Sequence, residues 1–242
     1  MKSKTPNIKH RTALFLDLPV TGYGKARELQ SSFVDARKKN IIDTDIFILL
    51  EHPPVFTLGR RGGLENLLAT EEFLEKSGIP VVHVERGGNI TFHGPGQLVV
   101  YPIIDLRSTG LTVPDYVSGL EEIMIRTAAD WGINAKRNPI NRGVWNKNNK
   151  LGSVGIAVRR GISFHGFAFN VNLSIEPFTW INPCGLQNIG ITSMERELSH
   201  KVSMNRVRKA VTGHIEAVFG LNLIATRLSE LQERLSSPTS LP

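Results

Sequence analysis

The pattern of apolar and polar positions predicts three long helices. Residues 22–39 place their apolar side chains near one face of a helix. Residues 114–131 begin with a proline and are followed by Gly132, which is the usual asymmetry of helix ends. We expect a third helix over residues 203–219. Thr70 can cap a shorter helix, because two glutamates follow it in the first turn, where negative charge suits the helix dipole.

Shorter runs of apolar residues predict a β-rich middle. The expected strands are residues 13–18, 45–51, 55–58, 80–85 and 97–106. Residues 141–171 resemble successive β-hairpins, with polar turns at 146–149 and 159–161. The strands gather in hairpins and do not alternate strictly with helices. An α+β fold with a mixed or antiparallel sheet is therefore favoured over a doubly wound fold.

The composition is that of a globular protein that needs no disulfide or metal for stability. The chain has 242 residues, of which 40% are hydrophobic and 21% charged. A chain of this length buries roughly 70% of its unfolded surface in a single domain. We expect a basic extension over residues 1–10, one folded domain over 11–226 and a polar tail over 227–242.

Hydropathy and charge indicate where the protein is located and which partners it can bind. Nothing in the chain approaches the ~20 apolar residues of a membrane span. The apolar run at 13–16 is shorter than the ~7–15-residue core of a signal peptide, so we expect a cytoplasmic protein. The net charge of +7 suits acidic partners. Basic residues are spread along the chain without a run of about five or six like charges, so a nucleic-acid arm is not indicated.

Glycines concentrate in loops at 58–63 and 85–97 and along the hairpin region at 152–166. Such density indicates either tight turns or close approach of the backbone to a ligand. The second loop follows a strand but does not lead into a helix, so it is not a dinucleotide-binding fingerprint. It also lacks the Gly-Lys-Ser/Thr ending of a P-loop. Two Arg-Gly-Gly copies leave an RNA-binding module as a weak alternative.

Cys184 and Lys150 are the main candidates for chemistry. Cys184 is the only cysteine, and Pro183 and Gly185 flank it in an irregular segment, which suits a reactive thiol in a reducing compartment. One cysteine offers no paired thiolates, so we expect no metal site. A Cys–His pair with His93 or His165 is open on residue types alone. Lys150 ends a polar turn, where a solvated lysine is the alternative to a functional one.

Three blocks in fixed order resemble the lipoyl(octanoyl) transferase family, over roughly residues 14–219. The blocks are His52-Pro53-Pro54-Val55-Phe56-Thr57-Leu58-Gly59, Arg86-Gly87-Gly88-Asn89-Ile90-Thr91-Phe92-His93-Gly94-Pro95-Gly96-Gln97-Leu98, and a third that runs from Gly143-Val144-Trp145 through Lys150, Gly155-Ile156 and His165-Gly166-Phe167-Ala168-Phe169-Asn170 to Pro183-Cys184-Gly185. The chain departs from the family pattern at Phe92, where tyrosine is common, and at Leu151-Gly152, where Ile-Ala is common.

The resemblance implies an α+β fold like that of the biotin and lipoate protein ligases, in one catalytic domain over residues 11–226. It implies that Cys184 carries the acyl thioester and that Lys150 assists it. The implied acyl-binding residues are Arg86, Gly87, Gly88, Asn89, Ile90, Thr91, Phe92, His93, Ser153, Val154, Gly155, Gly166, Phe167 and Ala168.

The implied reaction moves an octanoyl group from octanoyl-acyl carrier protein to a lysine of a lipoyl domain, as the first step of endogenous protein lipoylation. The donor is held on the phosphopantetheine of the carrier, so no other cofactor and no metal is expected. The implied acceptors are the lipoyl domains of 2-oxoacid dehydrogenase E2 subunits and the glycine cleavage H protein. The alternatives are an ATP-dependent lipoate or biotin ligase of the same fold, which would not need Cys184, and a cysteine hydrolase.

Overall fold

The computed structural model describes residues 11–139, 141–183 and 189–236. In chain order the elements are β1 (Arg11–Val20), α1 (Tyr23–Lys38), β2 (Asp45–Glu51), β3 (Val55–Leu58), η1 (Leu64–Asn66), α2 (Glu71–Ser77), β4 (Val81–His83), β5 (Ile90–His93), β6 (Gln97–Ile103), α3 (Leu106–Thr109), α4 (Val113–Ala129), β7 (Lys136–Arg137), β8 (Gly143–Asn146), β9 (Asn149–Arg159), β10 (Ile162–Asn170), η2 (Glu176–Trp180), β11 (Gly190–Ile191), α5 (Met194–Leu198), α6 (Met204–Phe219), β12 (Leu221–Ala225) and α7 (Leu228–Ser236).

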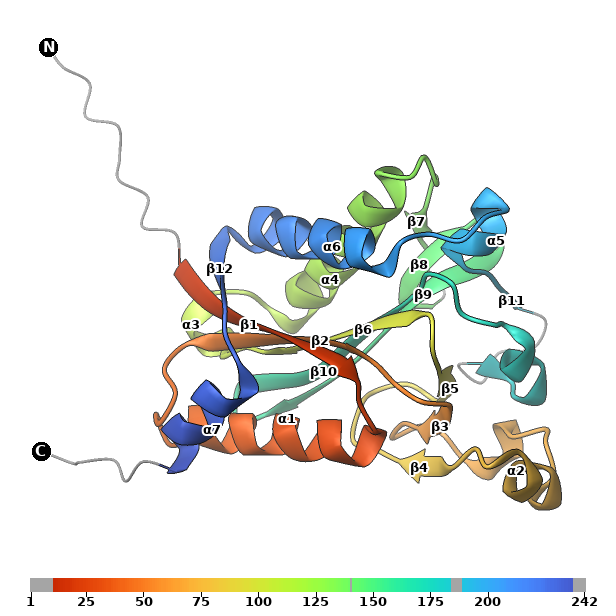
Figure 1. The fold of residues 1–242 in the computed structure, drawn as a ribbon, viewed down its shortest axis with the longest axis horizontal. Coiled ribbons are helices and arrows are strands. Elements are labelled where there is room, and N and C mark those ends of the chain that lie inside the picture. The colour runs from red at the N-terminus through yellow and green to blue at the C-terminus, as the bar shows by residue number, and fades with distance from the viewer. Residues whose placement is uncertain (1–10, 140, 184–188, 237–242) are drawn as a thin grey trace, which may run out of the picture.

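The larger sheet is mixed, as expected. Its strands run in the order β12-β1-β2-β6-β10-β9-β8-β7, and β11 adds to β9. The pairs β12–β1, β1–β2 and β11–β9 are parallel, whereas the path from β2 to β7 is antiparallel. Helices cover both faces: α4 and α6 lie on one side of the sheet, and α1 and α7 on the other (Figure 1). The predicted α+β class is confirmed.

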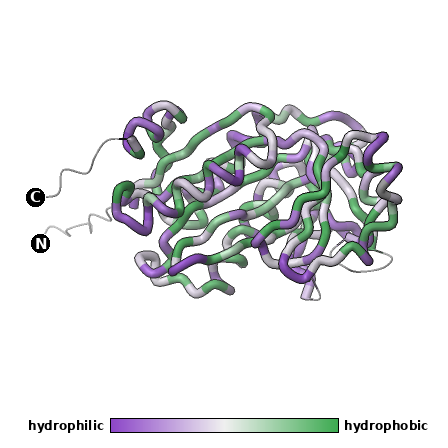
Figure 2. The backbone as a smooth tube through the Cα atoms, turned by 90° about the horizontal axis from the view of Figure 1, so that it is seen from below, coloured by the Kyte–Doolittle hydropathy of each residue, from purple (hydrophilic) through white to green (hydrophobic). Residues whose placement is uncertain are grey.

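Each face of the sheet has its own core. On one face, Tyr116 and Leu120 of α4 and Val211 of α6 share one hydrophobic cluster with Phe169 of β10. On the other face, Phe33 of α1 packs with Ile48 and other strand residues. Figure 2 shows hydrophilic and hydrophobic residues interspersed along the helices, so that one side of a helix can face the core and the other the solvent. None of the described helices is long and apolar enough to cross a membrane.

The helix starts are capped locally, as the sequence predicts for Thr70. The Thr70 side chain accepts from the Phe73 backbone N–H at the start of α2, and Ser203 accepts from Arg206 at the start of α6. Thr112 and Asp115 form a reciprocal capping box at the start of α4. The predicted hairpins also form, because β9 joins β8 and β10 through the two expected turns.

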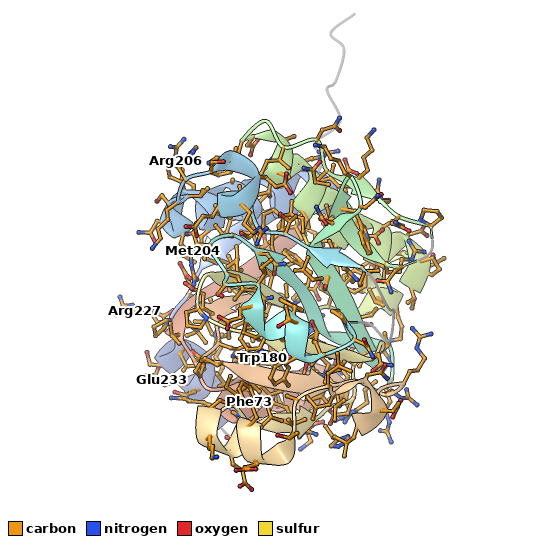
Figure 3. All side chains as sticks on the ribbon, turned by 90° about the vertical axis from the view of Figure 1, so that its right-hand side faces the viewer. Phe73, Trp180, Met204, Arg206, Arg227 and Glu233 are labelled. Carbon is orange, nitrogen blue, oxygen red and sulfur yellow. The ribbon has the colours of Figure 1, made fainter. Side chains whose placement is uncertain are left out.

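A smaller sheet, in the order β4-β3-β5, lies with α2 at the end of the molecule away from the two termini (Figure 1). The prediction that residues 85–97 are a loop is wrong in part. Residues Ile90–His93 form strand β5, because β3 supplies an antiparallel partner in which Val55 faces His93. Figure 3 shows Phe73 of α2 beside Trp180 of η2, whose rings are 4.8 Å apart and close this end of the molecule.

Three further features differ from the sequence-based expectation. The expected strand over 97–106 ends at Ile103, because Asp105 caps the short helix α3. Strand β12 was not predicted, and it pairs with β1. The expected polar tail contains α7, whose Leu231 is fully buried in the core on the α1 side. The domain limits at 10/11 and 226/227 stay predictions.

Candidate active site

A cavity of about 320 Å³ opens between the glycine-rich segment 86–93 and strands β9 and β10. All the proposed acyl-binding residues line it except Phe92, and Lys150 lines it too. The other lining residues are Tyr23, Arg61, Val99, Tyr101, Val117, Asn141, Arg142, Ile156 and His165. Segments that are far apart in the sequence thus meet at one place. The lining combines an apolar surface with four cationic side chains and, among the described residues, no carboxylate.

Phe92 lies outside this cavity. Its ring packs against Phe56 at 5.2 Å and Phe178 at 5.8 Å in the core of the smaller sheet. Thr91 and His93 line the cavity because neighbouring side chains of a strand point to opposite faces. Phe92 is therefore packed in the core of the smaller sheet and does not line this cavity, and its part in acyl binding stays a prediction.

Lys150 is buried, with 2% of its surface exposed, so the alternative of a solvated turn lysine is wrong. Its Nζ donates a hydrogen bond to Asn141 Oδ1 and lies 5.4 Å from the centre of the Trp145 ring. Gly143 makes room for it: the backbone there has φ of 125°, and an added Cβ would lie 2.8 Å from Lys150 Cε. The Gly143 N–H donates to the buried carboxylate of Glu121 at 2.8 Å.

Cys184 lies outside the described residues. The described chain stops at Pro183 and resumes at 189, from where β11 pairs in parallel with the start of β9. In this pairing Ile191 faces Lys150, and the Thr192 N–H donates to the Lys150 carbonyl at 3.0 Å. The contact between Cys184 and Lys150 stays a prediction.

The glycines of β9 and β10 serve close packing of protein on protein. The Gly87 N–H donates to the Ile156 carbonyl at 2.8 Å, which fastens the glycine-rich segment to β9. A Cβ on Gly155 would lie 3.2 Å from the Gly87 carbonyl and 3.0 Å from Arg86 Cδ. Only a strand without a side chain at this point lets the segment come so close.

Arg86 and His93 belong to a directed series of buried hydrogen bonds. Arg86 Nη2 donates to Thr57 Oγ1 at 2.8 Å, and Thr57 faces His93 Nε2 at 3.3 Å. His93 Nδ1 lies 2.7 Å from Gln97 Oε1. Because Gln97 Oε1 can only accept, His93 carries its proton on Nδ1 and accepts from Thr57 on Nε2. Burial lowers the pKa of His93 well below its usual value, so the ring is neutral.

The series continues across the larger sheet toward Lys150. Gln97 Nε2 donates to Asn170 Oδ1 at 2.9 Å, and Asn170 Nδ2 donates to the Thr192 carbonyl at 2.9 Å. Thr192 is the residue whose N–H binds the Lys150 carbonyl. Buried amides thus connect the glycine-rich segment to the strand that carries Lys150.

Sequence reasoning missed a buried polar group that packs against Tyr23, His93 and Tyr101 of the cavity lining. His52 Nδ1 donates to the Thr21 carbonyl at 2.6 Å, and its Nε2 accepts from the Tyr101 hydroxyl at 2.7 Å. Burial lowers the pKa of His52 to about 4 and raises the pKa of Tyr101. Tyr23 lies over His93, with ring centres 6.0 Å apart. The one available signal was His52 in the first family-like block.

Within the described residues, no group of three or more His, Cys, Asp or Glu side chains is placed to hold a metal ion.

Comparisons with known proteins agree with this arrangement. Residues 23–216 match the lipoyl protein ligase A/B catalytic domain. The octanoyltransferase of Desulfotalea psychrophila is 48% identical over 210 residues, which cover 86% of this chain and 94% of that protein. The octanoyltransferase of Syntrophobacter fumaroxidans is 44% identical over 226 residues, with 93% and 99% covered.

Solved structures share the fold at low identity. A bipartite lipoate protein ligase from Thermoplasma acidophilum has a TM-score of 0.73 at 16% identity, covering 93% of this chain and 91% of that one. Lipoate-protein ligase A bound with ATP has a TM-score of 0.71 at 16% identity, covering 94% and 92%. The predicted ligase-like fold is thereby confirmed. By its match to the catalytic domain and its identity to these relatives, the chain belongs to the octanoyltransferases, acyltransferases within the lipoyl protein ligase A/B family.

Proposed function

We propose that this acyltransferase moves an octanoyl group from octanoyl-acyl carrier protein to a lysine of a lipoyl domain, through a thioester on Cys184. The observation that carries the proposal is the buried Lys150, which lines the same cavity as the apolar residues Val154 and Phe167. This arrangement supports a site where a cationic or basic group meets the reacting end of a medium acyl chain.

In the first half-reaction, the Cys184 sulfur attacks the carbonyl of the donor thioester. A new carbon–sulfur bond forms to Cys184, the bond to phosphopantetheine breaks, and the leaving thiolate takes up a proton. The attacking form of cysteine is the thiolate, which a nearby ammonium stabilises. Lys150 supplies that charge in the proposal. One thioester replaces another, so the step is close to thermoneutral.

In the second half-reaction, the neutral amine of the lipoyl-domain lysine attacks the acyl-Cys184 carbonyl. The carbon–nitrogen bond forms, the carbon–sulfur bond breaks, and the proton lost by the amine goes to Lys150 in its neutral form and on to the Cys184 thiolate. An amide is more stable than a thioester, so this step runs downhill without ATP and without a cofactor of the enzyme's own.

The cavity lining supports selection of a medium chain. Burying about six methylenes at ~0.8 kcal/mol each contributes roughly 5 kcal/mol to acyl binding. The net charge of +7 also favours encounter with an acidic carrier protein, through long-range attraction. We expect the acceptors to be lipoyl domains of 2-oxoacid dehydrogenase E2 subunits and of the glycine cleavage H protein.

An ATP-dependent ligase is the second candidate, because lipoate-protein ligase A shares this fold. Such an enzyme adenylates a free acid and needs no cysteine. Activity that disappears only when ATP is withheld would favour it.

The test is intact-protein mass spectrometry after mixing the enzyme with octanoyl-acyl carrier protein in the absence of ATP. Cys184 is the only thiol of the chain, so Cys184→Ser is a complete control for thioester formation. We expect one octanoyl adduct on the wild type, none on Cys184→Ser, and discharge of the adduct by added lipoyl domain. No adduct on folded wild-type enzyme with intact donor would overturn the covalent mechanism.

A further inference from the structure

A second cavity, of about 300 Å³, lies on the far side of His165 from the first. It is lined by Arg27, Gln30 and Val34 of α1 together with Glu85, Arg159 and Phe164. Among the described residues, His165 is the one residue that lines both cavities. Its side chain therefore stands between two spaces of similar size.

The strand register places His165 at the opposite end of the first cavity from Lys150. Strands β9 and β10 are antiparallel, and His165 faces Ile156, whereas Lys150 lies near the start of β9. Six residues of strand at about 3.3 Å each separate Lys150 from Ile156 by roughly 20 Å. The side chains of Lys150 and His165 occupy part of that length, and the remainder suits a medium acyl chain.

His165 is held rigidly in this position. Its backbone has φ of 56°, a left-handed value that is unusual inside a strand, and its N–H donates to Gln30 Oε1 at 2.7 Å. The ring stacks on Phe164 at 5.0 Å and meets Tyr101 edge-on at 6.2 Å. Only 2% of the residue is exposed. A strained backbone of this kind persists only where the contacts around the residue hold its side chain in one orientation.

The Nε2 atom of His165 makes no hydrogen bond within the described part of the chain. Its Nε2 is buried, and the nearest carboxylate oxygen, Glu85 Oε2, is 3.7 Å away. Burial also lowers the pKa of His165 to about 4, so the imidazole is neutral near pH 7. A neutral ring can lie against the apolar end of an acyl chain at little cost.

We infer that His165 is the wall that ends the acyl cavity and limits the length of the acyl chain the enzyme accepts. The inference rests on the proposed function. A shorter residue at this position joins the two cavities, and a longer chain then passes between Tyr101 and Phe164 toward α1. Glycine is the cleanest replacement, because it adopts the left-handed backbone without strain.

The experiment compares octanoyl- and dodecanoyl-acyl carrier protein as donors for wild type, His165→Gly and His165→Asn. Asparagine also tolerates a left-handed backbone and is shorter than histidine, so it covers the case in which the glycine variant fails to fold. Four more buried methylenes make the ratio of dodecanoyl to octanoyl kcat/KM rise by about tenfold or more in His165→Gly. The ratio rises less in His165→Asn.

Arg160→Gly is the matched control. Arg160 is also left-handed, with φ of 51°, but it is exposed in the turn before β10 and lines neither cavity. In Arg160→Gly the ratio of dodecanoyl to octanoyl kcat/KM stays at the wild-type value. Folded His165 variants with the wild-type ratio would overturn the inference.

Calorimetric binding of free octanoate and dodecanoate separates this inference from the proposed function. If His165→Gly gains dodecanoate binding but neither the wild type nor the variants transfer an acyl group, the role of His165 as the end of the cavity is supported and the proposed transfer from carrier protein is contradicted. If the wild type transfers octanoyl normally and the His165 variants show no change of chain preference in either assay, the inference about His165 is contradicted while the proposed function stands.

Discussion

Gln97 and Asn170 face each other across strands β6 and β10, and the Gln97 amide donates to Asn170 Oδ1 at 2.9 Å. This bond joins two halves of the site. On one side Gln97 fixes the proton position of His93, and on the other Asn170 holds Thr192, whose N–H binds the Lys150 carbonyl. The glycine-rich segment and the Lys150 strand are therefore positioned together.

Replacing Asn170 with aspartate should break this connection. The carboxylate can still accept from Gln97, but it cannot donate to the Thr192 carbonyl and places negative charge beside it. We expect a loss of about 1–3 kcal/mol in the free energy of unfolding, measured with denaturant. Asn205→Asp on the exposed start of α6 is the control, and it should change stability by less than about 0.5 kcal/mol. Equal effects of the two substitutions would show that the buried series is not structural.

Lys150→Met should separate chemistry from folding. The substitution keeps most of the length of the side chain but removes its charge and its proton. We expect octanoyl transfer to fall by about 10²-fold or more, with folding retained, because methionine fills most of the space of the lysine but cannot carry its charge or its proton. Lys147→Met in the same turn is the control, since Lys147 is exposed and does not line the cavity. A wild-type rate in Lys150→Met would exclude Lys150 from the reaction.

Acid should destabilise the protein through its buried histidines. Burial lowers the pKa of His52 and of His165 to about 4, whereas in the unfolded chain both have a value near 6.5. Between about pH 6.5 and 4 the unfolded state binds more protons, so stability is full above this range and falls as the pH decreases. Each histidine contributes a slope of up to about 1.4 kcal/mol per pH unit.

Denaturant unfolding at several pH values measures this slope. His165→Asn should lower the slope of unfolding free energy against pH by the contribution of one histidine. His200→Asn, at an exposed position, is the control and should leave the slope unchanged. An unaltered slope in His165→Asn would mean that His165 titrates normally in the folded protein.

Leu231→Ala should show that the predicted polar tail is part of the folded domain. Leu231 of α7 is fully buried among the residues that pack on α1. Removing its side chain should cost about 2–5 kcal/mol of unfolding free energy. Ile224→Ala is the control, because Ile224 on β12 is 48% exposed and should cost much less. A negligible effect of Leu231→Ala would place the end of the domain before α7, at the predicted limit of 226.

The sequence by itself determined those features that depend on near neighbours in the chain. The cap at Thr70 and the turns of the β8–β9–β10 hairpins need only a few adjacent residues, and they form where the pattern predicts them. The family resemblance also identified most of the cavity lining, because those residues occur together in recognisable blocks.

Only the tertiary structure decided features that depend on distant partners. Strand β5 exists because β3 pairs with it, and that pairing turns Phe92 away from the cavity while His93 faces into it. The burial of Lys150 likewise depends on Gly143 and on β11, which lies 41 residues further along the chain, as in the pair Lys150–Ile191. Forming such contacts costs conformational entropy, and hydrogen bonds and packing with remote segments offset that cost. Because the partners are far apart in the chain, the local sequence gives no indication of them.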